Sequence, residues 1–329
     1  MARFFIALMA GCAATTPLAA QPPVPPLPPP PVAAGVAAHV TVAFNPPLDR
    51  ALHYRVTATK VRDGRPVTVW VDYELRFSRR PEGYRLAVQT VDAGTPGGSP
   101  AMNSMVRRTI TGVAPPYVLL LDRVGSIESM EDAEAYWEHL LAMTALLIRS
   151  DPRQHGPTDE AALAGIINQM RQVSPAARLT MTTENIAPIV QFGGGDYTIG
   201  EERQSEDQIE GPMGLSFRQQ SRLTADRVVD GRLFLSLHST IPEESMREAF
   251  QSFSSRIPVT GQGHNNQAER DRATAQLRTA RFDRQSEVAF EVAIDTGLIH
   301  RMSATDRTRL DMGEQHGNRT ETQLIERRD

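Results

Sequence analysis

The chain of 329 residues contains eight histidines, and histidine is the side chain most often used as a general base or a metal ligand. No two of them follow the His-Glu-x-x-His spacing that places two imidazoles and a carboxylate on one face of a helix. His53, His238 and His300 fall on predicted strands, where a surface or half-buried structural histidine is the common case. Because a zinc site needs three or four convergent ligands, we predict neither a metal site nor a cofactor.

Two glycine-containing stretches resemble catalytic motifs only in part. Residues 214–218 read Gly-Leu-Ser-Phe-Arg and lack the second glycine of a nucleophile elbow. Residues 193–196 read Gly-Gly-Gly-Asp and lack the Lys-Ser/Thr pair of a phosphate-binding loop. A connection from a helix to a strand accounts for these glycines. The sequence therefore names no catalytic residue.

The first twenty residues have the layout of a cleaved secretory signal peptide. A short basic start precedes an apolar run that is too short to span a bilayer, and Ala19-Ala20 comes before Gln21. An alternative reading uses Cys12, because Met-Ala-Gly-Cys is similar to the lipidation motif of bacterial lipoproteins. We favour simple export, which predicts a periplasmic protein without a transmembrane segment in the mature chain. Lipid anchoring through Cys12 is the alternative.

Composition excludes several kinds of chemistry. Cys12 is the only cysteine, so a chain cleaved after residue 20 has no disulfide and no thiol chemistry. Lys60 is the only lysine and lies on a predicted surface strand, which argues against Schiff-base chemistry. The formal net charge of −4 gives no reason to expect nucleic acid as a partner. Residues 21–38 are rich in proline and predict an extended, disordered spacer.

Period-two alternation of apolar and polar residues predicts a large β-sheet. The strongest examples are two hairpins, one over residues 286–310 that turns at Asp295-Thr296-Gly297, and one that turns at Asp230-Gly231. An early meander over residues 52–88 has the same alternation. We also predict strands over residues 105–113 and 117–124, and a last edge strand over residues 320–326.

The middle of the chain has helical periodicity. Residues 129–188 predict a helical segment, with Ser129 as the cap of its first helix and Ser174-Pro175 at the start of its last. A further amphipathic helix should open at Pro242. Strands early and late with helices between them predict one α+β domain over residues 39–329, in which a large curved antiparallel sheet has the helical segment packed on one face.

Three aromatic residues are candidates for a binding site. Trp70 lies on the polar side of its predicted strand, and Tyr136 and Trp137 lie on the first central helix. Large aromatic side chains most often supply packing area in a core. If helix and sheet do not close fully, the same side chains would line a groove for an apolar ligand.

The succession of leader, long meander, central helices and final strands such as Phe290 to Ile299 resembles exported proteins of Gram-negative bacteria. Their architecture is similar to the curved, half-open sheets of lipoprotein-carrier (LolA/LolB-like) folds. The resemblance implies ligand binding, but no functional residue of that family can be carried over to this sequence.

These observations favour a non-enzymatic periplasmic binding or scaffold protein of the cell envelope, whose partner is an apolar small molecule or an envelope protein. Two alternatives remain open. One is an envelope hydrolase that uses a pair of carboxylates from distant strands, and the other is a lipid-anchored assembly factor.

Overall fold

The computed structural model describes residues 38–62, 65–149, 157–210, 216–256, 281–312 and 315–328. The predicted signal peptide, with Cys12, lies outside these residues, and so does the spacer up to residue 37. Gly214, in the stretch similar to a nucleophile elbow, also lies outside them.

One antiparallel sheet dominates the part of the chain that the structure describes. Its eleven strands follow the order β6-β5-β4-β3-β2-β13-β12-β11-β10-β9-β8. Their bounds are β2 (Ala51–Arg62), β3 (Arg65–Arg80), β4 (Gly83–Gly94), β5 (Tyr117–Leu121), β6 (Ile127–Met130), β8 (Glu202–Glu210), β9 (Ser216–Val229), β10 (Arg232–Ile241), β11 (Arg281–Ala293), β12 (Ile299–Met312) and β13 (Gln315–Arg328). A separate pair joins β1 (His39–Thr41) to β7 (Asp196–Thr198).

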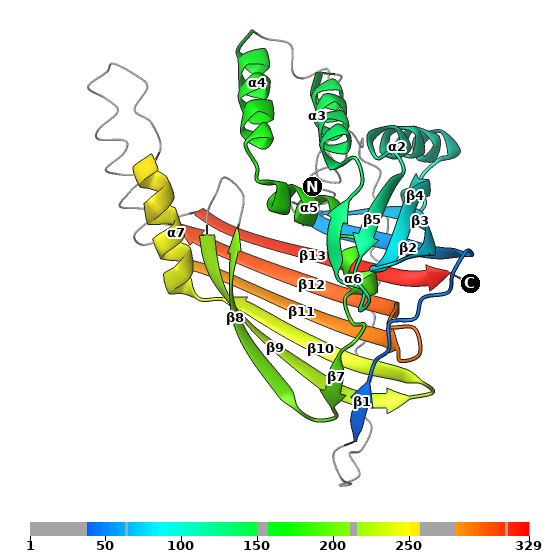
Figure 1. Cartoon of the computed structure of the whole chain (residues 1–329). Helices are drawn as coiled ribbons and strands as arrows, with labels where there is room; N and C mark the ends of the chain where they lie inside the picture. Colours follow the sequence, from blue (N-terminus) through cyan, green and yellow to red (C-terminus); the bar gives the residue numbers. More distant parts are fainter. Residues whose placement is uncertain are drawn as a thin grey trace.

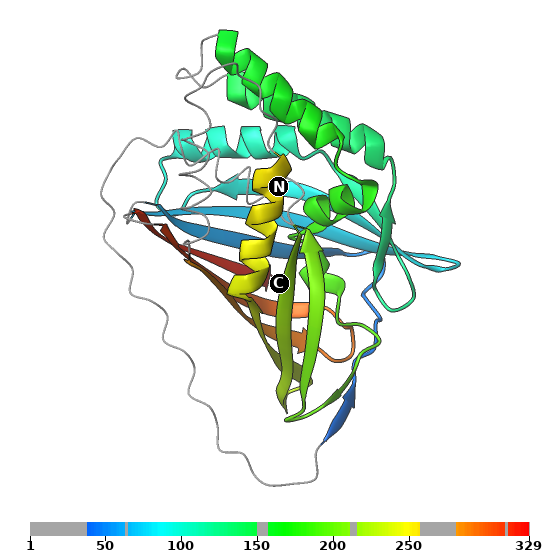
Figure 2. The same ribbon diagram turned by 90° about the vertical axis from the view of Figure 1, so that its left-hand side faces the viewer.

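The helices lie on the concave side of this curved sheet (Figure 1, Figure 2). Their bounds are α2 (Pro100–Val113), α3 (Ala133–Arg149), α4 (Pro157–Arg171), α5 (Pro175–Thr183), α6 (Ala187–Val190) and α7 (Glu243–Arg256). Residues of α3 and α6 share one core with the inward side chains of β2, β3 and β12, whereas α7 packs with Phe217 and Ile241 in a smaller cluster. The α+β class with a large curved antiparallel sheet is thus confirmed. No helix in the described ranges is long and apolar enough to cross a membrane.

Both predicted hairpins are present. β9 and β10 meet at Asp230 and Gly231, whose φ angles of 50° and 73° are those of a type I′ turn. β11 pairs with β12 along almost their whole length, and Gly297 takes a φ of 72° in the connection. Because successive side chains of a strand alternate between faces, Phe290 and Val292 are buried while Ala289 is exposed.

Two predicted strands require correction. Residues 105–113 belong to helix α2, which Ser99 caps by accepting a hydrogen bond from the Met102 backbone nitrogen (3.2 Å), with Pro100 in its first turn. The β-branched residues in that stretch suggested a strand, but Val106 and Val113 are buried at helical spacing. Residues 320–326 are not an edge, because β13 pairs with β12 on one side and β2 on the other.

The cap of the first central helix is also different from the prediction. Ser129 belongs to strand β6, and helix α3 starts at Ala133, directly after Asp132 in a left-handed conformation (φ 51°).

The three glycines at residues 193–195 serve close packing. A Cβ atom on Gly193 would lie 2.4 Å from the Val124 carbonyl oxygen and 2.5 Å from the Phe44 Cβ. The absence of a side chain thus lets this loop, the segment after β5 and Phe44 approach one another, which accounts for the glycines without phosphate chemistry.

Candidate binding groove

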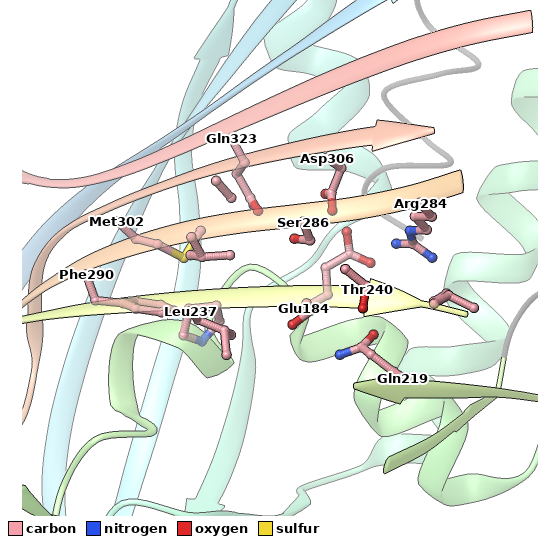
Figure 3. A pocket seen from close by; sticks show the side chains of 15 residues that line it. Glu184, Gln219, Leu237, Thr240, Arg284, Ser286, Phe290, Met302, Asp306 and Gln323 are labelled. Atoms are coloured by element: carbon pink, nitrogen blue, oxygen red, sulfur yellow. The ribbon is translucent and has the colours of Figure 1, made fainter. Parts of the chain in front are cut away.

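A cavity of about 360 Å³ lies between the concave face of β9–β13 and the segment that joins α5 to α6 (Figure 3). Its apolar lining consists of Pro188, Leu237, Ile241, Val288, Phe290, Met302 and Ala304. Its polar lining consists of Glu184, Gln219, Ser239, Thr240, Arg284, Ser286, Asp306 and Gln323. In Figure 3 the apolar side chains of Phe290, Met302 and Leu237 lie toward one end of the cavity, and the charged side chains of Arg284, Glu184 and Asp306 lie toward the other.

The apolar end follows from the register of the strands. Leu237 pairs with Val288, and Val288 pairs with Ala304, so these side chains form one row on the concave face. Phe290 and Met302 are paired in the next row and are almost completely buried. Phe290 is fixed from above by an edge-on contact with Phe192 (centroids 4.7 Å apart). The cavity therefore has a firm apolar floor.

A polar row crosses the same concave face two residues further along each strand. Its register partners run in the order Ser221, Ser239, Ser286, Asp306, Glu321 and Lys60. Ser221 and Ser239 share a hydrogen bond of 2.9 Å, and the Lys60 ammonium lies 3.3 Å from a Glu321 carboxylate oxygen. Polar residues are rare on the core-facing side of a sheet unless they are paired or functional. The row is thus the most informative feature of the concave face.

Arg284 is the cation of the cavity. It stands on β11 two residues from Ser286, on the same face, and its side chain is half-buried. It makes no ion pair with any residue in the described ranges. A guanidinium that has lost part of its hydration and has no fixed counter-ion attracts an anionic group, and its planar fork suits carboxylate or phosphate oxygens.

The roof of the cavity is anchored to its floor through Asn185. Gln323 Nε2 donates a hydrogen bond to Asn185 Oδ1 (2.9 Å), and Asn185 Nδ2 donates to the Tyr73 hydroxyl (3.4 Å). Asn185 directly follows Glu184, so this chain of hydrogen bonds holds the Glu184 backbone over the cavity. Burial raises the pKa of Tyr73 to about 12, with the Asn185 hydrogen bond acting in the opposite direction. Tyr73 therefore stays neutral at ordinary pH.

A much smaller polar space adjoins the cavity. It measures about 10 Å³, is lined by Lys60, Asn185 and Glu321, and shares Asp306 and Gln323 with the larger cavity. It is close to the smallest volume that holds a single water molecule. Within the described ranges, no group of three or more His, Cys, Asp or Glu side chains is placed to hold a metal ion.

The three aromatic residues suggested by the sequence lie elsewhere. Trp70 is half-buried on the convex face, where the Arg55 guanidinium carbon sits 4.2 Å from its ring centroid. Tyr136 and Trp137 lie on α3 and are buried in the core. The Tyr136 ring contacts the Tyr117 ring edge-on, with their centroids 5.0 Å apart. None of the three is among the residues that line the cavity. A role for them in ligand binding stays a prediction.

The residues that do line the cavity carry a signal that sequence reasoning missed. On β12 the core-facing positions read Met302, Ala304, Asp306, and on β11 they read Phe290, Val288, Ser286, Arg284. In each strand the core-facing positions change from apolar to polar residues within two such positions. Because the same change occurs in several strands, it predicts a polar site across the sheet. The register of the strands is needed to see that these polar residues are neighbours.

Comparisons with known proteins add little to this picture. No family model matches the chain, and no curated protein matches it. A solved structure on lipid–protein interactions in lipovitellin is 9% identical over 87% of this chain, with a TM-score of 0.41. This chain spans only 25% of the lipovitellin chain. The β domain of the Bordetella autotransporter BrkA is 8% identical, with a TM-score of 0.17, over 84% of this chain and 99% of that one. At these TM-scores neither likeness carries an argument, and the resemblance to lipoprotein carriers stays a prediction.

Proposed function

We propose that the protein is a non-enzymatic binding protein that holds the apolar chain of an amphipathic ligand in the concave groove. The observation that supports this proposal best is the apolar floor of Leu237, Val288, Phe290 and Met302, which lines a cavity of about 360 Å³. That volume falls in the range of roughly 300–1,000 Å³ that is usual for small-molecule sites.

The chemistry of the floor supports an alkyl chain as the part that enters. Val288 and Leu237 are only half-buried, so a ligand that covers them removes apolar surface from water. Each methylene group buried contributes about 0.8 kcal/mol, so two further methylenes in a chain should tighten binding roughly tenfold. This gain should stop when the chain fills the groove. A series of n-alkyl chains of increasing length, measured by calorimetry, tests that dependence.

Ala304 offers the sharpest test of the site. Its side chain is buried in the cavity lining on β12, and Ala289 lies on the exposed face of the neighbouring strand. Ala304→Phe should fill the groove and abolish binding of a fluorescent fatty-chain probe, whereas Ala289→Phe should leave binding unchanged. Val288→Glu is a second variant, at a half-buried position that tolerates change better. Equal binding by both groove variants and the control would refute the proposal.

Export is part of this proposal and rests on the sequence of residues 1–20. An exported protein would meet its amphipathic ligand, or an envelope protein that hands it over, in the periplasm. Intact-mass measurement of the protein from its host decides the route: a chain that starts at Gln21 supports simple export, and a lipidated chain that starts at Cys12 supports anchoring. Native mass spectrometry of the same material would show a co-purifying lipid or protein.

A hydrolase is the second candidate, because Glu184 and Asp306 contribute two carboxylates to the same cavity from distant parts of the chain (Figure 3). Such a pair is the minimum that acid–base hydrolysis requires. If the protein is a hydrolase of this kind, Glu184→Gln and Asp306→Asn should each abolish turnover of a bound ester or glycoside. If the protein only binds, mass spectrometry should recover the ligand intact from the wild type after prolonged incubation.

A further inference from the structure

The head group of the ligand follows from the one cation that lines the cavity. We propose that this head group is a carboxylate bound by Arg284, so that the groove takes a fatty acid. This inference rests on the proposed function, since it names the head of the same amphiphile whose chain lies on the apolar floor.

Arg284 is the only cation among the described residues that line the cavity, and Figure 3 shows its side chain at the end away from Phe290. Its register partners are Ile241 on β10 and Thr308 on β12, which carry no charge. Arg284 is half-buried and makes no ion pair within the described part of the chain. Its guanidinium has thus lost part of its hydration without gaining a fixed counter-ion, and an anion that enters the cavity supplies one.

The two carboxylates that line the cavity are already engaged within the protein. Asp306 is 8% exposed and interacts with other groups of the chain, and it also lines the small polar space to which Lys60 contributes a positive charge. Glu184 likewise has an interaction within the protein. We therefore assign neither carboxylate a part in binding the head group, and Arg284 is the charged group that a ligand can satisfy.

The shape and the charge of a carboxylate both suit this site. A guanidinium fork donates two parallel N–H bonds to the two oxygens of one carboxylate. Ser286 lies on the same face of β11 two residues away and lines the cavity, so its hydroxyl can donate to a lone pair that the fork leaves free. A phosphate monoester carries about 1.5 to 2 negative charges at pH 7, and no second cation lines the cavity in the described ranges. The singly charged carboxylate is thus the closer match.

The test compares four amphiphiles with the same twelve-carbon chain at pH 8, each below its micellar concentration: dodecanoate, dodecyl phosphate, dodecylamine and dodecyl maltoside. Displacement of N-phenyl-1-naphthylamine, an uncharged fluorescent probe, gives each Kd. Dodecanoate should bind about tenfold more tightly than the other three, because only its head group pairs bidentately with one guanidinium. Arg284→Gln should remove this advantage and leave the affinity for dodecyl maltoside unchanged. Arg284→Lys retains the charge without the fork and should keep only part of the advantage.

The matched control is Arg307→Gln, which removes an exposed arginine from the opposite face of β12, where it pairs with Glu287 at 3.2 Å. It should leave all four affinities unchanged. Circular dichroism would establish that each variant is folded, and Arg284→Met replaces Arg284→Gln if the latter is not.

Three results would overturn the carboxylate head group and leave chain binding intact. They are equal affinity for dodecanoate and dodecyl maltoside, tightest binding of dodecyl phosphate or dodecylamine, and an advantage of dodecanoate that survives the loss of Arg284. Failure of all four amphiphiles to bind would overturn the proposed function as well.

Discussion

The two faces of the sheet each carry a row of polar residues, and the two rows differ in their charges and surroundings. On the convex face the register aligns Glu291, Arg301, Glu326, Arg55 and Asp72, so the sign of the charge alternates from strand to strand. On the concave face the corresponding row runs from Ser239 through Asp306 to Lys60 and borders a cavity.

The difference lies in how far each row is hydrated. Opposite charges on neighbouring strands of an exposed face satisfy each other and remain hydrated, so each pair adds little to stability. Polar groups on the concave face lose hydration, and they would be replaced by apolar residues if packing were the only requirement. The concave row is thus the place to look for a ligand, and the convex row keeps its face of the sheet hydrated.

The largest contrast should come from two phenylalanines. Phe290 is 5% exposed on the concave floor, while Phe234 is half-buried on the convex face with the Arg227 guanidinium 4.2 Å from its ring centroid. Phe290→Ala should lower the free energy of unfolding by about 3–5 kcal/mol, because it leaves a cavity in the core. Phe234→Ala should lower it by about 1 kcal/mol. Urea unfolding measures both, and equal losses would contradict the assignment of the two faces.

The next effect should come from the buried ion pair. Lys60 is 8% exposed, so Lys60→Met leaves the Glu321 carboxylate partly desolvated without this cation. Arg319 also pairs with Glu321 and limits the damage. We expect a loss of about 2–3 kcal/mol in the free energy of unfolding.

The double variant Lys60→Met/Glu321→Leu separates pairing from packing. Replacing a buried pair by apolar residues of similar size is often neutral, so the double variant should recover most of the lost stability. If the double variant has the same free energy of unfolding as Lys60→Met, the loss comes from the packing of the two side chains and not from an unpaired charge.

Much of the fold was within reach of the sequence. The alternation over residues 286–310 and the Asp230-Gly231 turn located both hairpins correctly, because one buried face imposes a period of two on each strand. Residues 105–113 contain β-branched side chains, which are common in strands, but Ser99 and Pro100 before them cap and start a helix. The position of β13 could not be found locally, since its partner β2 lies at the other end of the chain.

The groove was harder to predict than the fold. Asp306 and Glu321 were visible as charged residues on predicted strands, whereas Arg284 lies just before the predicted hairpin. Only the pairing of distant strands places Asp306 and Glu321 at one level, with Arg284 in the next row. Glu184 comes from the end of α5, and its position depends on the hydrogen bonds of Asn185 to β13 and β3. The size of an aromatic side chain is evident in a sequence, whereas the register between distant strands is not.

Alkaline pH offers a smaller test of the concave face. The folded-state pKa of Tyr73 is raised to about 12 by burial, above the ordinary value of about 10 in an unfolded chain. Stability from this group is therefore complete below pH 10 and is lost as pH rises toward 12, by at most about 1.4 kcal/mol per pH unit. Burial raises the pKa of Tyr117 and Tyr136 in the same direction. Tyr73→Phe should flatten the fall in unfolding free energy between pH 8 and pH 11, and an unchanged slope would show that Tyr73 is not the group that titrates.

The smallest effect should come from the convex row, at Arg55. Its guanidinium covers the Trp70 ring and donates two hydrogen bonds to Asp72 (2.7 and 2.6 Å). The pKa of Arg55 is raised, chiefly by the hydrogen bond to Asp72. Because both partners are partly exposed, Arg55→Gln should lower the free energy of unfolding by no more than about 1 kcal/mol. The loss should shrink in 1 M salt, which reduces the Debye length to about 3 Å. Arg76→Gln, which breaks a more exposed pair with Glu74 on the same strand, is the matched control and should have a smaller effect still. If Arg55→Gln proved as costly as Lys60→Met, the convex row would be a structural network in its own right, and the contrast between the two faces would no longer point to the groove.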